Sequence, residues 1–464
     1  YPYFTAFFYK FNGGDIWLVM VIQALMGVGT VLGIHHLGVR LHGDRAGLLA
    51  GVAALLTAPT IWYEGWQLPT TLNLFLLVVV LNLLIACVAP DRNKWSRPGL
   101  IRVGLGLALG LASLNRPQNL LLAALILALI WWVERHGRWR GFRSPAIVLD
   151  VLVLTIAPVT WRNQITSGEP VPISANGGVN FYIGNHLTAD GRFSFPPGFP
   201  AYIGDIPTAS RRLASDQAGG DLDWRATSEH WLKKGLDDLV STPGRAVKLG
   251  LLKARLVVSW REMENNIVVS WVRERSGPAR WLRPSLGVLW LLALPALIEA
   301  VRRREPRDLA LLVPAATIVL VCLLFWVSTR NRLPLLIPLA VWSGVSLSSL
   351  RYWKSPVSLA AVALVAVVVF WPTADREGAG FLCDVGRIHA QKGEIMAARA
   401  NFTEALRLEP DHPMAMNGLA LTYMDSGQPD RAIAMLRELI RKHPDFEMAK
   451  QNLQAILNYQ KRNK

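Results

Sequence analysis

The sequence has little charge and almost no cysteine. Only 18% of its 464 residues are charged, whereas about 25% is usual for a soluble domain. The three cysteines, Cys87, Cys322 and Cys383, lie far apart, so the chain is not a disulfide scaffold. Hydrophobic residues make up 52% of the chain, and this content excludes intrinsic disorder, which requires low hydrophobicity.

Several catalytic motifs are missing as well. The sequence contains no Walker loop, no zinc-binding His-Glu-x-x-His or paired Cys-x-x-Cys spacing, and no Gly-x-Ser-x-Gly elbow. These absences argue against an ATPase, a metalloprotease and a serine hydrolase. Any chemistry must therefore come from another arrangement of residues.

Long hydrophobic runs, in contrast, are abundant. A helix needs about 20 residues to cross a bilayer, and ten runs in this sequence approach that length. We therefore expect a polytopic membrane protein with an all-α helical bundle. The runs are 15–37, 46–62, 69–89, 100–115, 117–133, 146–161, 285–301, 309–327, 333–350 and 355–372.

The net charge of +16 is concentrated in alternate short loops. Sixteen Lys and Arg residues and five acids occupy loops 38–45, 90–102, 134–143, 302–308 and 351–354, which gives a net charge of +11 there. This distribution follows the positive-inside rule, so these loops are expected in the cytoplasm. The basic excess is then a topology signal, and we expect no nucleic-acid partner.

The topology divides the chain into four regions. We expect an N-terminal transmembrane region at 1–161, a loop region with amphipathic helices at 162–284, further transmembrane helices at 285–372 and a tail at 380–464. The long loop and the tail fall on the side opposite to the basic loops. In a bacterium this arrangement predicts an inner-membrane protein whose loop and tail are periplasmic.

The long loop contains three distinct stretches. Residues 173–185 are rich in Gly and Asn, which predicts irregular backbone whose amides suit sugar hydroxyls or phosphate oxygens. A loop packed on the membrane surface is the alternative. Residues 222–240 and 243–260 have the apolar spacing of amphipathic helices, and the second is basic enough to lie on lipid headgroups.

The tail repeats itself at a shift of 34 residues. Gly393 aligns with Gly427, Ala398 with Ala432, and Pro410 with Pro444. This period and pattern predict a tetratricopeptide α-solenoid, in which small residues let paired helices approach. The repeats either bind a periplasmic protein or stabilise the chain as a short appendage.

A few charged residues lie at the outer ends of the hydrophobic runs, where the positive-inside rule disfavours basic residues. Arginine matches phosphate oxygens better than other side chains do. We therefore interpret this group as a lipid-phosphate site, with headgroup contact as the alternative for each arginine. The charged residues are Glu64, Arg116, Arg162, Arg330 and Arg332, and Tyr63 directly precedes Glu64 as a further candidate for substrate binding.

Taken in order, several segments resemble membrane glycosyltransferases of the GT-C fold. The similarity is to the branch of protein O-mannosyltransferases and lipid A aminoarabinose transferase, in a bacterial form with tetratricopeptide repeats. It extends over residues 1–350. The matching segments are 1–4, 11–15, 63–65, 110–117, 161–163, 177–185 and 330–334.

The resemblance implies an inverting hexosyltransferase that moves a sugar from a polyprenyl-phosphate donor to a protein or glycolipid acceptor. It implies no certain cofactor and leaves room for a divalent metal. The family's first-loop acid is expected upstream of Tyr1, since the chain begins without Met. Glu64 is then the catalytic candidate, with a structural role as its alternative.

The resemblance also implies that Arg116, Arg162, Arg330 and Arg332 contact the lipid phosphate. Asn180 and Asn185 would hold the substrate loop or the sugar. Two other functions stay open from the sequence: an O-antigen ligase or polymerase, and a non-catalytic membrane scaffold that presents the repeats.

Overall fold

The computed structural model describes residues 1–89, 97–135, 140–196, 199, 206–263, 285–372, 379–444 and 446–462. Every regular element in these ranges is a helix. The chain divides into two compact units. One contains the hydrophobic helices and most of the long loop, and the other contains the C-terminal helices.

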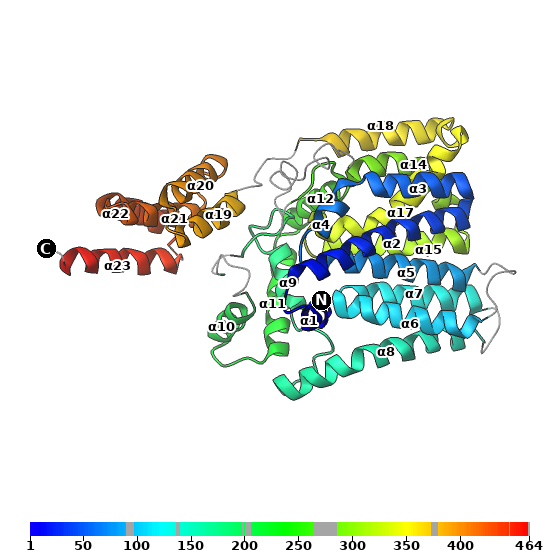
Figure 1. Ribbon diagram of the computed structural model, residues 1–464, viewed down its shortest axis with the longest axis horizontal. Coiled ribbons are helices and arrows are strands. Elements are labelled where there is room, and N and C mark those ends of the chain that lie inside the picture. The colour runs from blue at the N-terminus through cyan, green and yellow to red at the C-terminus, as the bar shows by residue number, and fades with distance from the viewer. Residues whose placement is uncertain are drawn as a thin grey trace. The chain divides into compact units, whose positions relative to one another are not determined.

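The first unit contains a bundle of ten helical segments within the described ranges, which run side by side (Figure 1). Each coincides with one of the ten predicted hydrophobic runs. The segments are α2 (Ile16–His42), α3 with α4 (Asp44–Leu56 and Ala58–Glu64), α5 (Thr70–Val88), α6 (Pro98–Asn115), α7 (Asn119–Glu134), α8 (Arg140–Ser167), α14 (Leu286–Arg303), α15 (Pro306–Leu324), α17 (Leu336–Ser348) and α18 (Pro356–Phe370).

Not all ten segments are long enough to be membrane spans by themselves. Five described helices have the length and hydropathy to cross a bilayer, and the α3–α4 pair, bent by 57°, makes a sixth. Helices α7 and α18 are apolar but shorter, and α17 has only 13 residues. The fold class of an all-α multi-pass bundle is confirmed, and among the described residues five or six of the ten expected spans are long and apolar enough to cross a bilayer as continuous helices.

Local sequence explains where these helices begin and end. The Asp15 side chain accepts a hydrogen bond from the Trp17 N–H and caps α2. Gly43, with φ of 88°, makes the sharp turn between α2 and α3. A Cβ on Gly38 would lie 2.7 Å from the Gly47 Cα, so only glycine permits this close crossing of α2 and α3.

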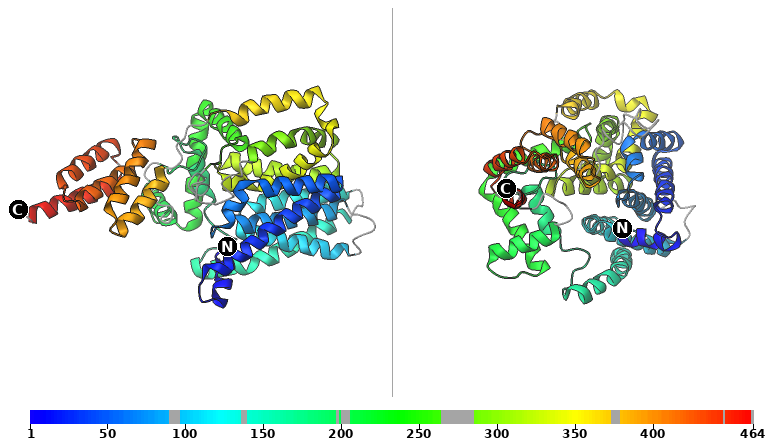
Figure 2. Two further views of the ribbon diagram at one scale, coloured as in Figure 1. Left: turned by 45° about the horizontal axis from the view of Figure 1, so that its top comes forward. Right: turned by 60° about the vertical axis from the view of Figure 1, so that its left-hand side comes forward.

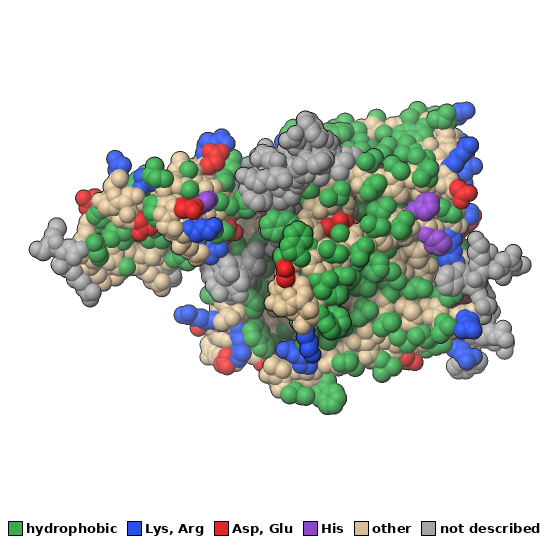
Figure 3. All heavy atoms as spheres, in the orientation of Figure 1, with side chains coloured by type: hydrophobic (Ala, Val, Ile, Leu, Met, Phe, Trp, Pro, Cys, Tyr) green, Lys and Arg blue, Asp and Glu red, His purple; other side chains and the backbone are tan. Residues whose placement is uncertain are grey.

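The surface of the bundle matches a membrane environment. Hydrophobic side chains cover its visible side, whereas Lys, Arg and His gather at the end where α2 meets α3 (Figure 3). That end holds the described parts of the basic loops; residues 90–96 and 136–139 of those loops lie outside the described residues.

The long loop forms helices at the opposite end of the bundle from the basic loops (Figures 1 and 2). They are α9 (Gly177–Asn185), α11 (Trp224–Ser241) and α12 (Pro243–Val258), and the loop also contains α10 (Ile206–Ala218). The two amphipathic helices, α11 and α12, are thus where the sequence predicts them. Residues 264–284 of the loop lie outside the described residues.

The prediction of irregular backbone at 173–185 is wrong for α9, whose residues Gly177–Asn185 are helical. Its glycines serve close packing instead. A Cβ on Gly178 would lie 1.7 Å from the Ser228 carbonyl oxygen, and one on Gly184 would lie 2.1 Å from that of Phe325. These glycines therefore let α9 touch α11 and the end of α15.

Other helix ends also differ from the sequence expectation. Tyr63 and Glu64 are the last residues of α4, not part of a loop, because Pro59 starts a short helix after the bend. A short helix α1 (Pro2–Phe11) precedes α2. Helix α8 continues to Ser167, so Arg162 lies within a helix and does not follow one.

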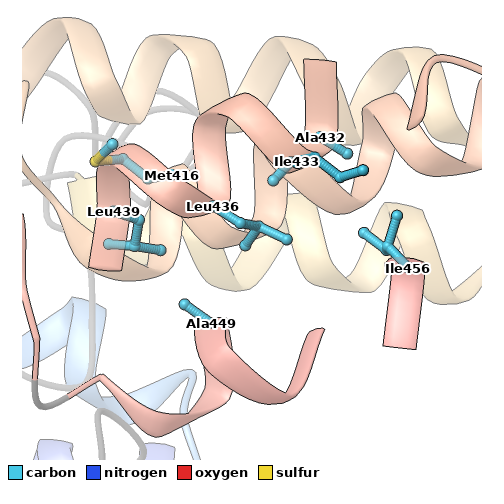
Figure 4. Packing of buried hydrophobic residues seen from close by; sticks show 8 residues of the cluster. Met416, Ala432, Ile433, Leu436, Leu439, Ala449 and Ile456 are labelled. Carbon is cyan, nitrogen blue, oxygen red and sulfur yellow. The ribbon is translucent and has the colours of Figure 1, made fainter. Parts of the chain in front are cut away.

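The second unit contains two helix hairpins and a final helix, as the 34-residue period predicts. They are α19 (Ala379–Gln391), α20 (Ile395–Leu408), α21 (Pro413–Asp425), α22 (Pro429–Lys442) and α23 (Glu447–Arg462). Ala432, Leu436 and Leu439 of α22 are fully buried against Met416 of α21 and Ile456 of α23 (Figure 4). The small repeat residues thus sit where helices approach.

Leu436 tests the packing of these repeats. The change Leu436→Ala removes a fully buried side chain and should cost about 2–5 kcal/mol of the unfolding free energy of this unit. Amide hydrogen exchange over α21–α23 measures this loss. Met396→Ala, at a side chain that is 74% exposed, should change exchange little. Equal effects of the two changes would contradict this packing.

Candidate functional site

A buried polar cluster lies at the loop-helix end of the bundle, where α4, α6 and α15 end. Tyr63, only 1% exposed, interacts electrostatically with Arg116, Arg330, Arg332 and Glu262. The structure thus brings together four of the residues predicted from sequence and adds a carboxylate. The Tyr63 hydroxyl is buried and has no hydrogen-bond partner among the residues that the structure describes.

Arg116 follows the last residue of α6 and is 4% exposed. Its guanidinium donates to the Arg330 carbonyl oxygen at 3.1 Å and to the Thr70 hydroxyl at 3.2 Å, with a longer contact of 3.5 Å to Asn331 Oδ1. All three acceptors are neutral, and the buried Nε has no partner in the described ranges. Within the described part of the chain, Arg116 is therefore a buried cation without a carboxylate partner.

Arg332 is fully buried and ties the long loop to α16 (Thr329–Arg332), the short helix between α15 and α17. Its Nη1 donates to the carbonyl oxygens of Leu256 at 3.0 Å and Ser259 at 2.6 Å. Its Nη2 donates to the Arg261 carbonyl oxygen and, at 2.9 Å, to Glu262 Oε2. Both terminal nitrogens are thus used within the protein.

Glu262 is the residue of this cluster that sequence reasoning missed. Its Oε2 accepts from Arg332 and also from the Thr329 hydroxyl at 2.8 Å, while its buried Oε1 has no partner among the described side chains and backbone. The same segment is held by two further hydrogen bonds: the Thr329 N–H donates to the Met263 carbonyl oxygen at 3.0 Å, and the Met263 N–H donates to the Thr329 hydroxyl at 2.7 Å. No local motif marks Glu262; only its place directly after the amphipathic stretch 243–260 could have drawn attention to it.

A second buried cation, Lys253 of α12, joins α9 to the end of α15. Its Nζ donates to Asn185 Oδ1 at 2.8 Å and to the Leu323 carbonyl oxygen at 3.0 Å, and Asn185 Nδ2 donates to the Leu324 carbonyl oxygen at 2.8 Å. Lys253 and Asn185 thus donate hydrogen bonds to carbonyl oxygens at the end of α15, which have no acceptor role within the helix. Lys253 was expected on an exposed basic face, but the fold places it inside; burial also lowers its pKa to about 8.

Glu64 lies apart from the arginine cluster. It is half-buried and faces Gly27 of α2, and its carboxylate makes no hydrogen bond or ion pair with the residues that the structure describes. The last turn of α4 therefore presents Tyr63 to the arginines and Glu64 to α2.

Arg162 and Asn180 also lie outside the cluster. Arg162 is exposed on α8, and its guanidinium carbon lies 5.9 Å from the centroid of the Tyr3 ring. Asn180 is half-buried in the middle of α9. The described residues contain no group of three or more His, Cys, Asp or Glu side chains that could hold a metal ion.

The balance of charge in the cluster points to an anion. In the part of the chain that the structure describes, Arg116 and Lys253 are buried with neutral acceptors only, and Glu262 already pairs with Arg332. Burying an uncompensated cation costs several kcal/mol by order of magnitude. An anionic ligand near Arg116, Arg330 and Tyr63 would remove this cost, and a phosphate would also match the guanidinium geometry.

Comparisons with known proteins support the resemblance at both ends of the chain. Residues 1–161 match the model of a family described as dolichyl-phosphate-mannose-protein mannosyltransferase. Residues 389–457 match the model of the tetratricopeptide repeat. The predicted similarity to membrane mannosyltransferases and the predicted repeats are thereby confirmed. No curated protein sequence shows a significant match to the chain.

The chain is similar to several solved structures at low identity. ArnT from Cupriavidus metallidurans bound to undecaprenyl phosphate is 17% identical, with a TM-score of 0.45, over 94% of this chain and 69% of that one. The Archaeoglobus fulgidus oligosaccharyltransferase with Zn and sulfate is 13% identical, with a TM-score of 0.42, over 83% and 46%. AglB from the same organism, with an inhibitory peptide and dolichol-phosphate, is 14% identical, with a TM-score of 0.42, over 83% and 49%. The chain spans about half the length of these two oligosaccharyltransferase chains.

Arg332 should matter more for stability than an exposed arginine on the same face. The change Arg332→Met leaves Glu262 buried without its cation and should cost about 3–5 kcal/mol of unfolding free energy. Thermal unfolding of the protein in detergent measures it. Arg162→Met, the exposed counterpart, should shift stability by less than about 0.5 kcal/mol; similar losses in both variants would argue against the role of Arg332.

Lys253 should make stability rise with pH. Its pKa is about 8 in the folded protein against 10.5 unfolded, so between these values the unfolded state holds more protons and stability increases with pH. The thermal midpoint of the wild type should rise from about pH 8 to about pH 10 relative to that of Lys253→Met. Parallel pH profiles would show that Lys253 titrates normally.

Proposed function

We propose that the protein is an integral-membrane glycosyltransferase. It transfers a sugar from a polyprenyl-phosphate donor to an acceptor at the periplasmic face of a bacterial inner membrane, with inversion at the anomeric carbon. The single observation that carries this proposal is Arg116, a buried guanidinium that lacks a carboxylate partner among the described residues. The family match over residues 1–161 supplies the reaction class.

Arg116, Arg330 and Tyr63 form the phosphate site in this proposal. As the bond between the sugar and the lipid phosphate breaks, negative charge builds up on the phosphate oxygens. Donors already held in place near that charge stabilise the transition state without having to reorganise. Tyr63 fits this role because its hydroxyl is buried and unpartnered within the described ranges, so a phosphate oxygen would give it an acceptor.

The remaining polar residues hold the site together. Arg332 and Glu262 fix the segment from Leu256 to Met263 against α16. Lys253 and Asn185 fix α9 and α12 at the end of α15. We assign these four residues to positioning, although Arg332 and Asn185 were first interpreted as substrate ligands.

In this proposal, the Glu64 carboxylate accepts the proton of the acceptor hydroxyl. An inverting transfer needs a group that accepts the proton of the attacking hydroxyl, and the Glu64 carboxylate has no partner among the described residues. The exposed Arg162 fits contact with lipid headgroups better than contact with the donor. Asn180 on α9 stays a candidate for the sugar.

The acceptor is a protein or a glycolipid in this proposal. The tail helices α19–α23 give the protein a surface for a periplasmic partner, since tetratricopeptide repeats present extended faces for binding. This part of the proposal rests on the repeat match alone.

Arg116 is the residue to change first. In full-length protein supplied with polyprenyl-phosphate hexoses and periplasmic or membrane acceptors, Arg116→Met should lower the rate of transfer about 10²–10³-fold. The release of polyprenyl phosphate measures the rate. Arg162→Met, at an exposed arginine on the same face, should transfer at the wild-type rate. Wild-type rates in both variants would contradict the proposed phosphate site. If neither the wild type nor the variants transfer sugar, the scaffold function is favoured.

A further inference from the structure

Helix α2 carries two residues, one helical turn apart, that both face Glu64. Gln23 is fully buried, and its Nε2 donates to the carbonyl oxygens of Glu64 at 2.8 Å and Trp66 at 3.0 Å. Gly27 is also buried, and it lies beside the Glu64 carboxylate. Residues at positions i and i+4 of a helix lie on the same face, so one face of α2 meets both the backbone and the side chain of Glu64.

Gln23 fixes where the end of α4 lies. Polar side chains in a membrane helix are costly unless they have partners, and Gln23 uses every part of its amide. Its Oε1 accepts from the Tyr1 hydroxyl at 2.6 Å, and its two N–H groups hold the turn of residues 64–66 that follows α4. The backbone of Glu64 is therefore anchored to α2.

Gly27 leaves the space that the carboxylate occupies. A Cβ at this position would lie 2.0 Å from Glu64 Oε1 and 2.4 Å from its Cδ. Gly27 has ordinary helical backbone, since it is not among the residues with positive φ. Glycine in a helix interior costs about 0.5–1 kcal/mol relative to alanine, so its presence here needs a reason, and the space for Glu64 supplies one.

We infer that Gln23 and Gly27 form a seat on α2 that positions the Glu64 carboxylate for the acceptor. Gln23 sets the position of the backbone, and Gly27 sets how closely the carboxylate approaches α2. Both are positioning residues, because they act through Glu64. The inference rests on the proposed function of Glu64 as the group that serves the acceptor.

The substitution Gly27→Ala tests the seat. The added methyl meets only the end of a flexible side chain, so the fold should persist while the carboxylate moves. We expect transfer to fall to the level of Glu64→Gln, with little change in thermal midpoint and in binding of undecaprenyl phosphate. The matched control is Gly104→Ala in α6, where the nearest atom lies at an ordinary 3.5 Å; it should keep full transfer.

A second-site change separates positioning from general damage. Shortening the side chain with Glu64→Asp makes room for the alanine, so the double variant Gly27→Ala/Glu64→Asp should transfer faster than Gly27→Ala alone. In contrast, adding Gly27→Ala to Glu64→Gln should cost nothing further, because the same function is already lost. Full transfer in Gly27→Ala would contradict the positioning role of Gln23 and Gly27. So would losses of transfer in the double variants that equal the sum of the losses in the single variants.

A readout without substrate separates this inference from the proposed function. Labelling of Glu64 by a hydrophobic carbodiimide, followed by mass spectrometry, needs neither donor nor acceptor. Gly27→Ala should label at a rate different from that of the wild type, and Gly104→Ala at the wild-type rate. Equal rates in all three would overturn the seat even in an active enzyme. A changed rate in a protein that transfers no sugar would support the seat and reject the proposed function.

Discussion

The buried hydrogen bonds of Arg332 hold the loop end of the bundle together. One guanidinium binds carbonyl oxygens of residues 256–261 and the Glu262 carboxylate, so the long loop is fixed beside α16. A buried ion pair is rarely a large net gain in stability. Its value here is geometric: it holds the end of α12 and the segment up to Glu262 beside α16.

With the loop fixed, the rest of the cluster has an excess of positive charge. Arg332 is neutralised by Glu262, but Arg116 and Lys253 have only neutral acceptors among the described residues. Lysine can relieve this cost by losing its proton, as the pKa of about 8 for Lys253 indicates. Arginine stays charged, so an anion close to the guanidinium is needed to offset the buried charge of Arg116. In the proposed function, a lipid phosphate supplies this anion.

The sequence predicts the helices of this fold well, since their signals are local. Hydrophobic length locates the bundle helices, and a period of 34 locates the repeats. The site is harder because its chemistry depends on partners far apart in the chain. Arg116 and Arg332 look alike in sequence, yet in the described ranges Arg116 lacks a carboxylate partner and Arg332 pairs with Glu262. The glycines of α9 suggest a loop, whereas they permit close backbone contact that only the tertiary structure reveals.

The proposed binding site for polyprenyl phosphate consists of Arg116, Arg330 and Tyr63. The most direct measurement is an experimental structure of the full-length protein with undecaprenyl phosphate in a lipid nanodisc. We expect phosphate oxygens within about 3 Å of the Arg116 guanidinium and the Tyr63 hydroxyl. A phosphate bound elsewhere, for example at the exposed Arg162, with Arg116 still bonded only to Thr70 and the 330–331 segment, would contradict it.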